Sequence, residues 1–197
     1  MKKYVIGMHF AKGLLWVISG PMFAGKTSEL IRLYDRTIFA NQKSIIVKPM
    51  LDNRYSNEGI STHDNRTRKS YVLLNIEELN EIVSLEKPDN VFIDEAQFFT
   101  SKVLNVIDDL RKIGINVYVS LLNQTSEGIP FPFIDKKEDV GTLLAKADYI
   151  ETFTAICPVC GRFATKSFKL ESTGQEIDVG GSNKYEPRCF EHWEPRR

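Results

Sequence analysis

Residues 20–27 have the composition of a loop that binds phosphate groups. They follow the pattern G-x-x-x-x-G-K-[ST] and are, in order, Gly20, Pro21, Met22, Phe23, Ala24, Gly25, Lys26 and Thr27. Loops of this pattern direct backbone N–H groups at a nucleotide phosphate, while the lysine contacts the β- and γ-phosphates and the hydroxyl ligates Mg²⁺. The alternative is a glycine-rich turn that precedes a helix by coincidence. An apolar stretch before the loop and a helical pattern after it favour phosphate binding.

Two adjacent carboxylates, Asp94 and Glu95, follow the apolar residues 91–93. A carboxylate at the end of a buried strand can hold the Mg²⁺ that accompanies a bound nucleotide. Because neighbouring residues of a strand point to different sides, Glu95 can face a substrate hydroxyl as a general base. The alternative is that Asp94 caps the next helix. With a phosphate loop upstream, we expect the Mg²⁺ role for Asp94.

The three cysteines lie in the last quarter of the chain, together with a histidine at matching spacing. Cys157 and Cys160 form C-x2-C, and Cys189 and His192 form C-x2-H. Three thiolates and one imidazole complete a tetrahedral Zn²⁺ site, and a site made only of protein ligands is structural. The alternative is three buried cysteines and an unrelated histidine. We expect zinc binding, with the metal supplying much of the folding energy of a small C-terminal lobe.

The elements that must position these residues alternate between strand and helix. Apolar stretches at 13–19, 44–47, 91–93 and 115–122 predict buried strands, and helical spacing of apolar residues predicts helices at 26–40, 76–83 and 103–110. This alternation predicts an α/β fold with a mostly parallel sheet, helices on both faces, and a phosphate loop after the first strand. We expect an α/β ATP-binding domain over 1–153 and a small zinc-binding β lobe over 154–197.

Two segments lack periodicity and are interpreted as loops. Residues 50–68 suggest a long functional loop, and residues 123–142, which include the charged run 135–139, suggest an exposed loop that could form a lid. The remaining histidines, His9 and His63, lack a ligand pattern. For His63 we favour a loop-stabilising hydrogen bond over a catalytic role.

Composition excludes several classes of function. The 197 residues carry 26 basic and 26 acidic side chains, so the formal net charge is zero. This balance argues against non-specific binding to nucleic acid or anionic lipid as the main activity. No apolar stretch approaches the roughly 20 residues that span a bilayer. We expect a cytoplasmic protein without a membrane or nucleic-acid partner and with its cysteines reduced.

Taken together, the motifs resemble thymidine kinase of the cellular and bacterial type. The resemblance covers nearly the whole chain in the right order. It is carried by the phosphate loop, residues 52–56 (DNRYS), 61–64 (STHD), 93–99 (IDEAQFF) and the C-terminal zinc lobe. It implies transfer of the γ-phosphate of ATP to the 5′-hydroxyl of thymidine, with Mg²⁺ for catalysis, Zn²⁺ for structure, and assembly as a homotetramer.

The resemblance also implies roles for individual residues. Glu95 is the expected base, Thr27, Asp94 and Asp52 the expected Mg²⁺ residues, and Arg54 the group that stabilises charge near the transferred phosphoryl group. A lasso loop over 170–185 is expected to close over the nucleoside. The expected nucleoside contacts are Met22, Phe98, Phe131, Thr165, Val179, Gly180 and Tyr185.

The chain departs from the family pattern after the strand at 115–122. Asn123 replaces an acid and Ser126 replaces an aromatic residue that lines the base pocket. These changes leave two alternatives open. One is a kinase of the same fold for another or modified pyrimidine nucleoside, and the other is a catalytically silent regulatory protein that binds ATP and zinc. The Asp94–Glu95 pair and Arg54 favour catalysis, because a pure binder needs no base.

Overall fold

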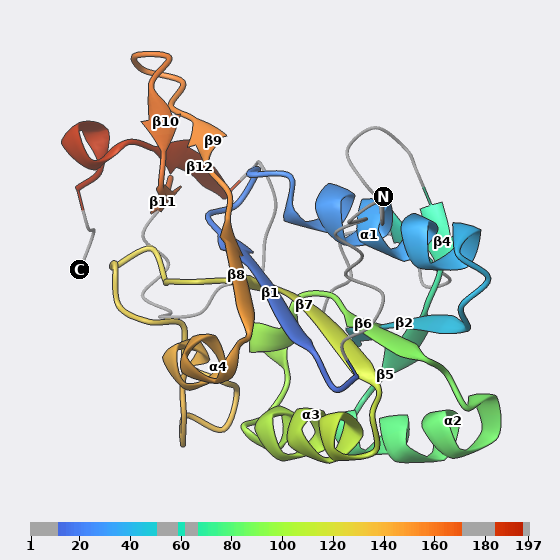
Figure 1. Ribbon diagram of the computed structural model, residues 1–197. Coiled ribbons are helices and arrows are strands. Elements are labelled where there is room, and N and C mark those ends of the chain that lie inside the picture. The colour runs from blue at the N-terminus through green and yellow to red at the C-terminus, as the bar shows by residue number, and fades with distance from the viewer. Residues whose placement is uncertain (1–11, 51–58, 62–66, 171–183, 195–197) are drawn as a thin grey trace, which may run out of the picture.

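A six-stranded parallel sheet forms the centre of the molecule (Figure 1). The computed structural model describes residues 12–50, 59–61, 67–170 and 184–194. Within them the sheet has the order β5-β2-β6-β7-β1-β8, and every neighbouring pair is parallel. Its strands are β1 (Leu15–Gly20), β2 (Ser44–Pro49), β5 (Tyr71–Leu73), β6 (Asn90–Ile93), β7 (Asn116–Leu122) and β8 (Tyr149–Thr152). The predicted α/β class with a mostly parallel sheet is confirmed.

Alternating side chains of the central strands pack against helices on both faces of the sheet. On one face, Ile18, Phe92 and Tyr118 pack with α1 (Lys26–Phe39), and the rings of Phe92 and Tyr118 stack at 4.5 Å. On the other face lie α2 (Leu79–Glu86), α3 (Lys102–Lys112) and α4 (Val140–Lys146). Continuous apolar strands are therefore expected, because both faces of each strand are buried.

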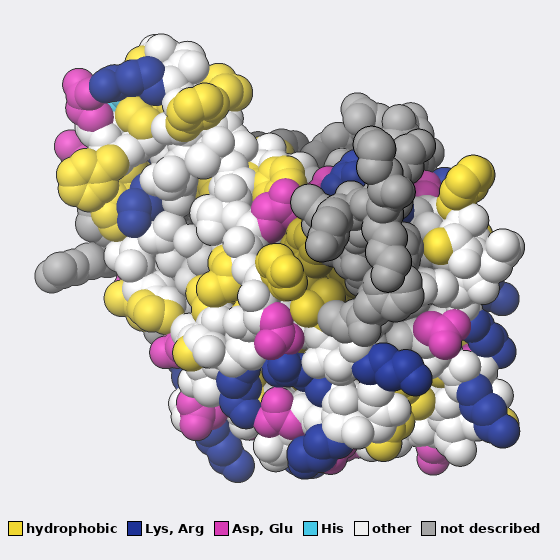
Figure 2. Space-filling model, viewed as in Figure 1, with side chains coloured by type: hydrophobic (Ala, Val, Ile, Leu, Met, Phe, Trp, Pro, Cys, Tyr) yellow, Lys and Arg dark blue, Asp and Glu magenta, His cyan; other side chains and the backbone are white. Residues whose placement is uncertain are grey.

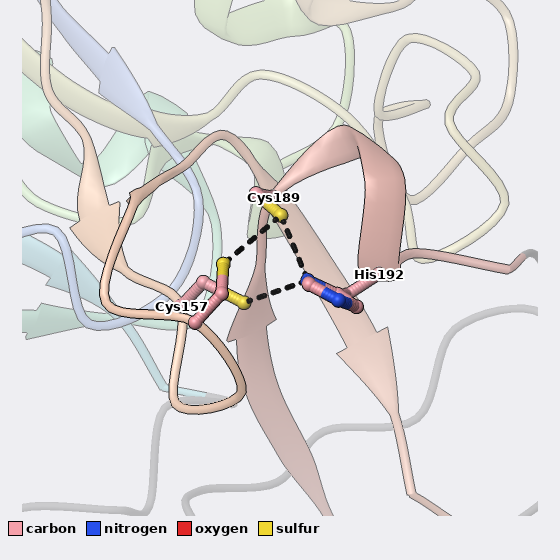
Figure 3. Close-up of side chains that lie close together, drawn as sticks. Cys157, Cys189 and His192 are labelled. Carbon is pink, nitrogen blue, oxygen red and sulfur yellow. Dashed lines mark hydrogen bonds between the residues drawn. The ribbon is translucent and has the colours of Figure 1, made fainter.

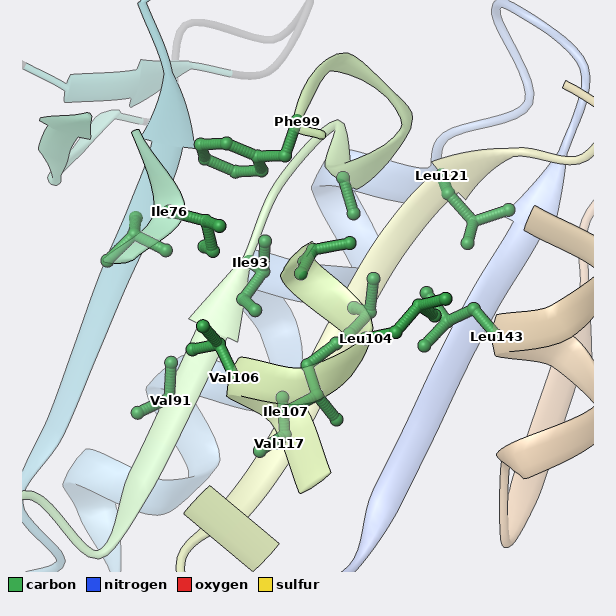
Figure 4. Packing of buried hydrophobic residues seen from close by; sticks show 14 of the residues in the cluster. Ile76, Val91, Ile93, Phe99, Leu104, Val106, Ile107, Val117, Leu121 and Leu143 are labelled. Atoms are coloured by element: carbon green, nitrogen blue, oxygen red, sulfur yellow. The ribbon is translucent and has the colours of Figure 1, made fainter. Parts of the chain in front are cut away.

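The helix α3 shows how the amphipathic pattern sets this packing (Figure 4). Val103, Ile107 and Leu110 recur at helical spacing and are at most 2% exposed. They meet the side chains of β6 and β7 that point to the same face. The helix ends before Gly114, whose φ of 85° is the left-handed conformation that glycine adopts most easily.

Two short antiparallel pairs form the C-terminal lobe. In one, β9 (Ala155–Ile156) pairs with β10 (Phe163–Ala164), and in the other, β11 (Lys166–Lys169) pairs with β12 (Tyr185–Arg188). The 3₁₀ turn η3 (Phe190–His192) follows. The predicted small β lobe is thus present. The domain boundary between 153 and 154 stays a prediction, and it falls between the end of β8 and the start of β9.

The lobe has little apolar core of its own. Its buried cluster consists of Ala155, Cys157, Ala164 and Cys189 with Ala24 of the phosphate loop. Four of its large apolar side chains are exposed instead, namely Ile156, Val159, Phe163 and Phe190, whereas Phe168 and Tyr185 are buried. Figure 2 shows apolar side chains on the surface of the lobe at the upper left. A lobe whose own apolar cluster consists of small residues needs another source of stability.

The segment 123–142 differs from the predicted exposed loop. Phe131 and Phe133 are buried in the main core, and α4 begins at Val140. The carboxylate of Asp135 accepts hydrogen bonds from the backbone N–H and the hydroxyl of Ser101, at 3.0 and 2.7 Å. The exposed residues of the segment are Glu127, Ile129, Pro130, Ile134 and the charged residues 136–138. This anchoring argues against a free lid.

Other elements were not predicted. They include β5, β8 and a hairpin of β3 (Gly59–Ser61) and β4 (Thr67–Lys69) within the expected loop 50–68. β2 also continues to Pro49, past the predicted stop at 48–49. Among the described residues, no helix is long and apolar enough to cross a membrane.

Candidate active site and metal centre

The phosphate loop connects β1 to α1 at the carboxyl edge of the sheet. Gly20 ends β1 opposite Leu122 of β7 and lies so close to the chain at Phe153 that a Cβ atom would be 2.4 Å from the Phe153 carbonyl oxygen. Gly25 precedes α1 with a φ of 84°. Both positions need glycine, one for the close approach and one for the left-handed turn. The strand–loop–helix context predicted for phosphate binding is confirmed.

Lys26 is held inside this loop. Its side chain is 6% exposed, and its Nζ donates a hydrogen bond to the carbonyl oxygen of Pro21 at 2.8 Å. As the first residue of α1, it also stands at the positive end of the helix dipole. An ammonium group and the N-terminus of a helix therefore face the same small volume, which is the electrostatic arrangement that favours a bound phosphate.

Asp94 and Thr27, both predicted to hold Mg²⁺, are in direct contact. Asp94 follows β6 and is 3% exposed, and the Thr27 hydroxyl donates to its carboxylate with both oxygen distances at 3.3 Å. Mg²⁺ binds oxygen at about 2.1 Å, so adjacent octahedral ligands lie about 3 Å apart. The spacing of these oxygens fits ligands that share one hydrated Mg²⁺ ion. Asp94 does not cap the following turn, because Glu95 occupies that position.

Ser120 of β7 fixes the orientation of this carboxylate. Its hydroxyl is fully buried and donates to Asp94 Oδ1. The Ser120 hydroxyl oxygen in turn accepts a hydrogen bond from the backbone N–H of Glu95 at 3.3 Å. One buried serine thus contacts both members of the acidic pair. Ser120 was not predicted as a site residue, although a serine within an otherwise apolar strand is a recognisable signal of a buried polar contact.

Glu95 has an unusual backbone conformation. Its φ of 52° lies in the left-handed region, which is uncommon for residues other than glycine. Its side chain accepts a hydrogen bond from Gln97 Nε2, and Gln97 Oε1 in turn accepts from the backbone N–H of Leu122 at 3.1 Å. Such strain persists where surrounding contacts impose it, and it is typical of functional positions. Gln97 is fully buried and is a second residue that positions the acidic pair, although its role was not predicted from the sequence.

Four of the expected nucleoside contacts share one buried cluster. Met22, Phe98, Phe131 and Tyr185 all belong to the main core cluster, and each is less than 10% exposed. Phe98 and Phe131 meet edge to face, with ring centroids 5.8 Å apart at 86°. The aromatic edge-to-face contact provides an apolar surface at the carboxyl edge of the sheet. Thr165 lies before β11, where its carbonyl oxygen accepts a hydrogen bond from Gln124 Nε2 at 2.8 Å.

The remaining candidates lie outside the described residues. They are Asp52, Arg54, Val179 and Gly180, together with most of the expected lasso loop and the histidines His9 and His63. Their roles stay predictions.

The four predicted zinc ligands converge at the lobe (Figure 3). The ligand atoms of Cys157, Cys160, Cys189 and His192 all lie within 4.8 Å of one another. Cys160 Sγ is 3.7 Å from Cys189 Sγ, and His192 Nδ1 is 3.2 Å from Cys189 Sγ and 3.9 Å from Cys157 Sγ. With zinc–sulfur bonds of about 2.3 Å, a tetrahedral site places its sulfurs about 3.8 Å apart. The cluster therefore fits Zn²⁺.

The surroundings of Cys157 and Cys160 favour the thiolate form that metal binding requires, whereas burial raises the pKa of Cys189. Burial acts to raise the pKa of Cys157, but backbone N–H groups of Cys189, Val159 and Cys160 lower it to about 6. The Arg162 guanidinium, 3.4 Å from the sulfur, lowers the pKa of Cys160. Arg162 is itself held by an ion pair with Glu191.

The lobe is attached directly to the phosphate loop. The backbone N–H of Met22 donates to Ser167 Oγ of β11 at 3.0 Å, and this contact is buried. Ser167 was not singled out from the sequence. The contact connects the phosphate-binding element to the metal-binding lobe.

A phosphate loop between a parallel strand and a helix, with a buried carboxylate against its threonine, defines the class of phosphate-loop nucleotide-binding proteins. A family model described as thymidine kinase matches residues 13–193. Curated relatives carry the same description. The thymidine kinase of Thermococcus kodakarensis is 40% identical over 91% of this chain and 93% of its own length. Those of Mycoplasma capricolum and a Rhodothermus species are 36% and 35% identical, covering 90% and 94% of this chain and 87% and 83% of their own lengths. The chain therefore belongs to the thymidine kinase family.

Proposed function

We propose that the protein transfers the γ-phosphoryl group of ATP to the 5′-hydroxyl of thymidine and so forms thymidine monophosphate. Membership in the thymidine kinase family supports the activity and the substrate. The observation that carries the mechanism is the contact between Thr27 of the phosphate loop and Asp94, with Glu95 next to it. These groups bring nucleotide binding, metal binding and a base to one edge of the sheet.

The residues of the phosphate site bind and orient ATP. Backbone N–H groups of the loop and the Lys26 ammonium would hold the β- and γ-phosphates, and Thr27 and Asp94 would hold Mg²⁺. When bound, Mg²⁺ would neutralise part of the phosphate charge. Ser120 keeps the Asp94 carboxylate in place through its buried hydrogen bond. Catalysis by such a site consists mainly of positioning and charge stabilisation.

Glu95 acts on the other substrate. Its carboxylate accepts the proton of the 5′-hydroxyl as the oxygen attacks the γ-phosphorus, and Gln97 holds the carboxylate in place. Met22, Phe98, Phe131 and Tyr185 contact the nucleoside, with Thr165, Val179 and Gly180 contributed by the lobe. Arg54 and Asp52 act beside the transferred phosphoryl group.

The Cys157–Cys160–Cys189–His192 cluster holds a structural Zn²⁺ ion. The support is the fit of its sulfur spacing to a tetrahedral site and the absence of a substrate position among four protein ligands. The ion would stabilise a lobe whose own buried cluster consists of small side chains.

We also propose that the protein works in the cytoplasm as a homotetramer. Assembly is supported by the edge strand β8, where Tyr149 and Ile150 are each 53% exposed. Light scattering coupled to gel filtration measures the mass of the assembly, and a monomeric mass would contradict this proposal.

The decisive experiment for the function is ATP consumption with Mg²⁺ and a panel of nucleosides, beside a blank without nucleoside. Turnover with thymidine or deoxyuridine supports the proposal. Turnover with another nucleoside instead assigns a different substrate, with Asn123 and Ser126 as the first candidates for the cause. ATP binding without nucleoside-dependent turnover favours the regulatory alternative.

A further inference from the structure

The loop after β7 is a compact turn that leads into the nucleoside site. We call residues 124–130 the 124–130 loop. Within it, the backbone N–H of Thr125 donates to the Ile129 carbonyl at 2.9 Å, and that of Gly128 donates to the Thr125 carbonyl at 3.1 Å. The next residue, Phe131, donates to the Asn123 carbonyl at 3.4 Å and meets Phe98 edge to face. Because Phe131 follows this loop directly, a displacement of the loop also moves Phe131.

Trp193 of the C-terminal lobe lies against this loop. Its indole Nε1–H donates to the carbonyl oxygen of Ser126 at 3.1 Å. Its ring lies on the backbone of Gly128, where a Cβ atom would be 2.6 Å from the ring atom Cη2. The contact therefore depends on the absence of a side chain at Gly128. An aromatic ring from the lobe thus reaches the stretch in which the family pattern expects an aromatic residue at 126.

Lys166 holds the ring and the loop together. Its Nζ donates to Gln124 Oε1 at 2.8 Å and lies 4.9 Å from the centre of the Trp193 ring. Gln124 also donates to the Thr165 carbonyl at 2.8 Å. A cation over an indole face contributes roughly 0.5–2 kcal/mol, depending on its exposure. The lobe thus contacts the 124–130 loop from two separate segments, the start of β11 and the chain after η3.

The metal cluster fixes the chain that carries Trp193. The residue before it, His192, is one of the four zinc ligands, and its carbonyl oxygen accepts from Arg188 Nη1 at 3.4 Å. Arg188 in turn lies over the ring of Phe168, 4.9 Å from its centre. The position of the indole is therefore set by the metal cluster and β12 on one side and by the 124–130 loop on the other.

We propose that Trp193 is a positioning residue that couples the metal-binding lobe to the nucleoside site through the 124–130 loop, an inference that rests on the proposed kinase function. Trp193 holds the loop so that Phe131 meets Phe98 in the arrangement that the nucleoside needs. Its contacts reach the loop and Lys166, whereas Lys26, Thr27 and Asp94 are held by separate contacts. Removing the indole therefore weakens nucleoside binding selectively and leaves ATP binding intact.

The test compares Michaelis constants for the two substrates. In Trp193→Ala, the KM for thymidine rises about tenfold or more, since small misplacements in a substrate site have large effects, while the KM for ATP stays within about twofold. Trp193→Phe gives an intermediate KM, because a ring remains on Gly128 without the donor to Ser126. Phe163→Ala, at an exposed aromatic of the same lobe, leaves both constants unchanged. Equilibrium dialysis without ATP measures thymidine affinity directly. We expect the unaltered protein and Phe163→Ala to bind thymidine most tightly, Trp193→Phe less tightly and Trp193→Ala least tightly.

Alanine substitutions at two glycines test the contact between Trp193 and the 124–130 loop by changing the loop instead of the tryptophan. Gly128 and Gly114 have φ of 81° and 85°, so alanine causes similar backbone strain at both positions. At Gly128 it also clashes with Trp193, whereas at Gly114 a Cβ meets Lys12 only at 3.6 Å. Gly128→Ala therefore reproduces the rise in the KM for thymidine, and Gly114→Ala does not.

Several results would overturn the coupling. They are an unchanged thymidine KM in both Trp193 variants, an equal rise in both Michaelis constants, or the same effect from both glycine variants. If Trp193→Ala does not fold, Trp193→Phe and Gly128→Ala decide the matter alone. Absence of thymidine turnover in the unaltered protein would instead contradict the proposed function, so the two failures are distinguishable.

Discussion

At the scale of single residues, the acidic pair after β6 separates into two different environments. Asp94 is buried and receives hydrogen bonds from Thr27 and Ser120, whereas Glu95 is half-buried and turned aside by its left-handed backbone. A carboxylate fixed by hydroxyl donors suits metal binding, and a partly accessible one suits proton transfer. Two neighbouring residues of the same charge can therefore have different functions.

Replacing the base tests this division. Glu95→Gln keeps the shape of the side chain but cannot accept the proton, so we expect turnover to fall by about 10²–10⁴ while ATP binding is retained. Single-turnover kinetics and an ATP-binding titration measure the two quantities. Nearly normal turnover would assign the base to another group.

Ser120 provides a second test, because its hydroxyl orients Asp94. Ser120→Ala removes a hydrogen bond to a charged acceptor, so we expect a loss of about 1.5–3 kcal/mol in the free energy of unfolding and a higher Mg²⁺ concentration for half-maximal activity. A matched control is Ser70→Ala, since Ser70 is also buried but its hydroxyl has no hydrogen-bond partner among the described residues. Equal effects of the two substitutions on the Mg²⁺ requirement would show that Ser120 does not position the metal ligand.

At the scale of elements, the segment 131–140 is attached to the helical face rather than exposed as a lid. Phe133 is fully buried, and the Asp135 carboxylate binds the residue that precedes α3, Ser101. The hydrogen bonds from Ser101 hold the pKa of Asp135 below its ordinary value. A lowered pKa in the folded state means that the ionised form contributes stability at neutral pH and loses it as the carboxylate becomes protonated.

This contribution is testable through its pH dependence. Asn resembles the protonated acid, so we expect Asp135→Asn to lower the thermal midpoint at pH 7. The difference from the unaltered protein should shrink as the pH falls through and below the ordinary pKa of 3.8. Glu81→Gln, at an exposed position of α2, controls for the loss of a negative charge. A difference that stays constant down to low pH would mean that ionisation of Asp135 is not involved.

Sequence patterns predicted the elements that are continuous and strongly apolar. β1, α1, β6, α3 and β7 were predicted close to their observed bounds, because each combines an apolar pattern with a clear end. β8 was missed because it is an edge strand whose Tyr149, Ile150 and Thr152 are exposed, so burial leaves no pattern in its sequence. The segment around Phe133 was misjudged because its charged neighbours dominate the local composition.

The residues of the site likewise divide into those with a local sequence pattern and those without one. The phosphate loop and the metal cluster were predictable because each depends on fixed local spacing. Ser120, Gln97, Ser167 and Trp193 were not assigned, because their contacts join residues that only the fold brings together. A single buried serine or an aromatic residue near the end of the chain carries no local signature of its partner.

At the scale of the whole molecule, two parts with unequal apolar cores are joined by a few specific contacts. The sheet and its helices enclose a large apolar core, whereas the separate buried cluster of the lobe consists of alanine and cysteine side chains. Between them run the hydrogen bonds from Met22 to Ser167 and from Trp193 to Ser126. The proposed zinc ion would therefore stabilise the lobe, whereas the sheet has an apolar core of its own.

Metal removal should accordingly unfold the lobe while the sheet stays folded. After treatment with a strong chelator in the absence of nucleotide, we expect the amide hydrogens of β9–β12 to lose protection from exchange. Those of β1, β6 and β7 should keep it. The reason is that the energy of metal binding contributes to folding only in the lobe, which contains the metal ligands. Cys157→Ser should give the same pattern without a chelator. The 124–130 loop should lose protection together with the lobe, since Trp193 and Lys166 hold it. Uniform loss across the sheet would show one cooperative unit, and full protection of the lobe would show that the Cys157–His192 cluster does not stabilise it.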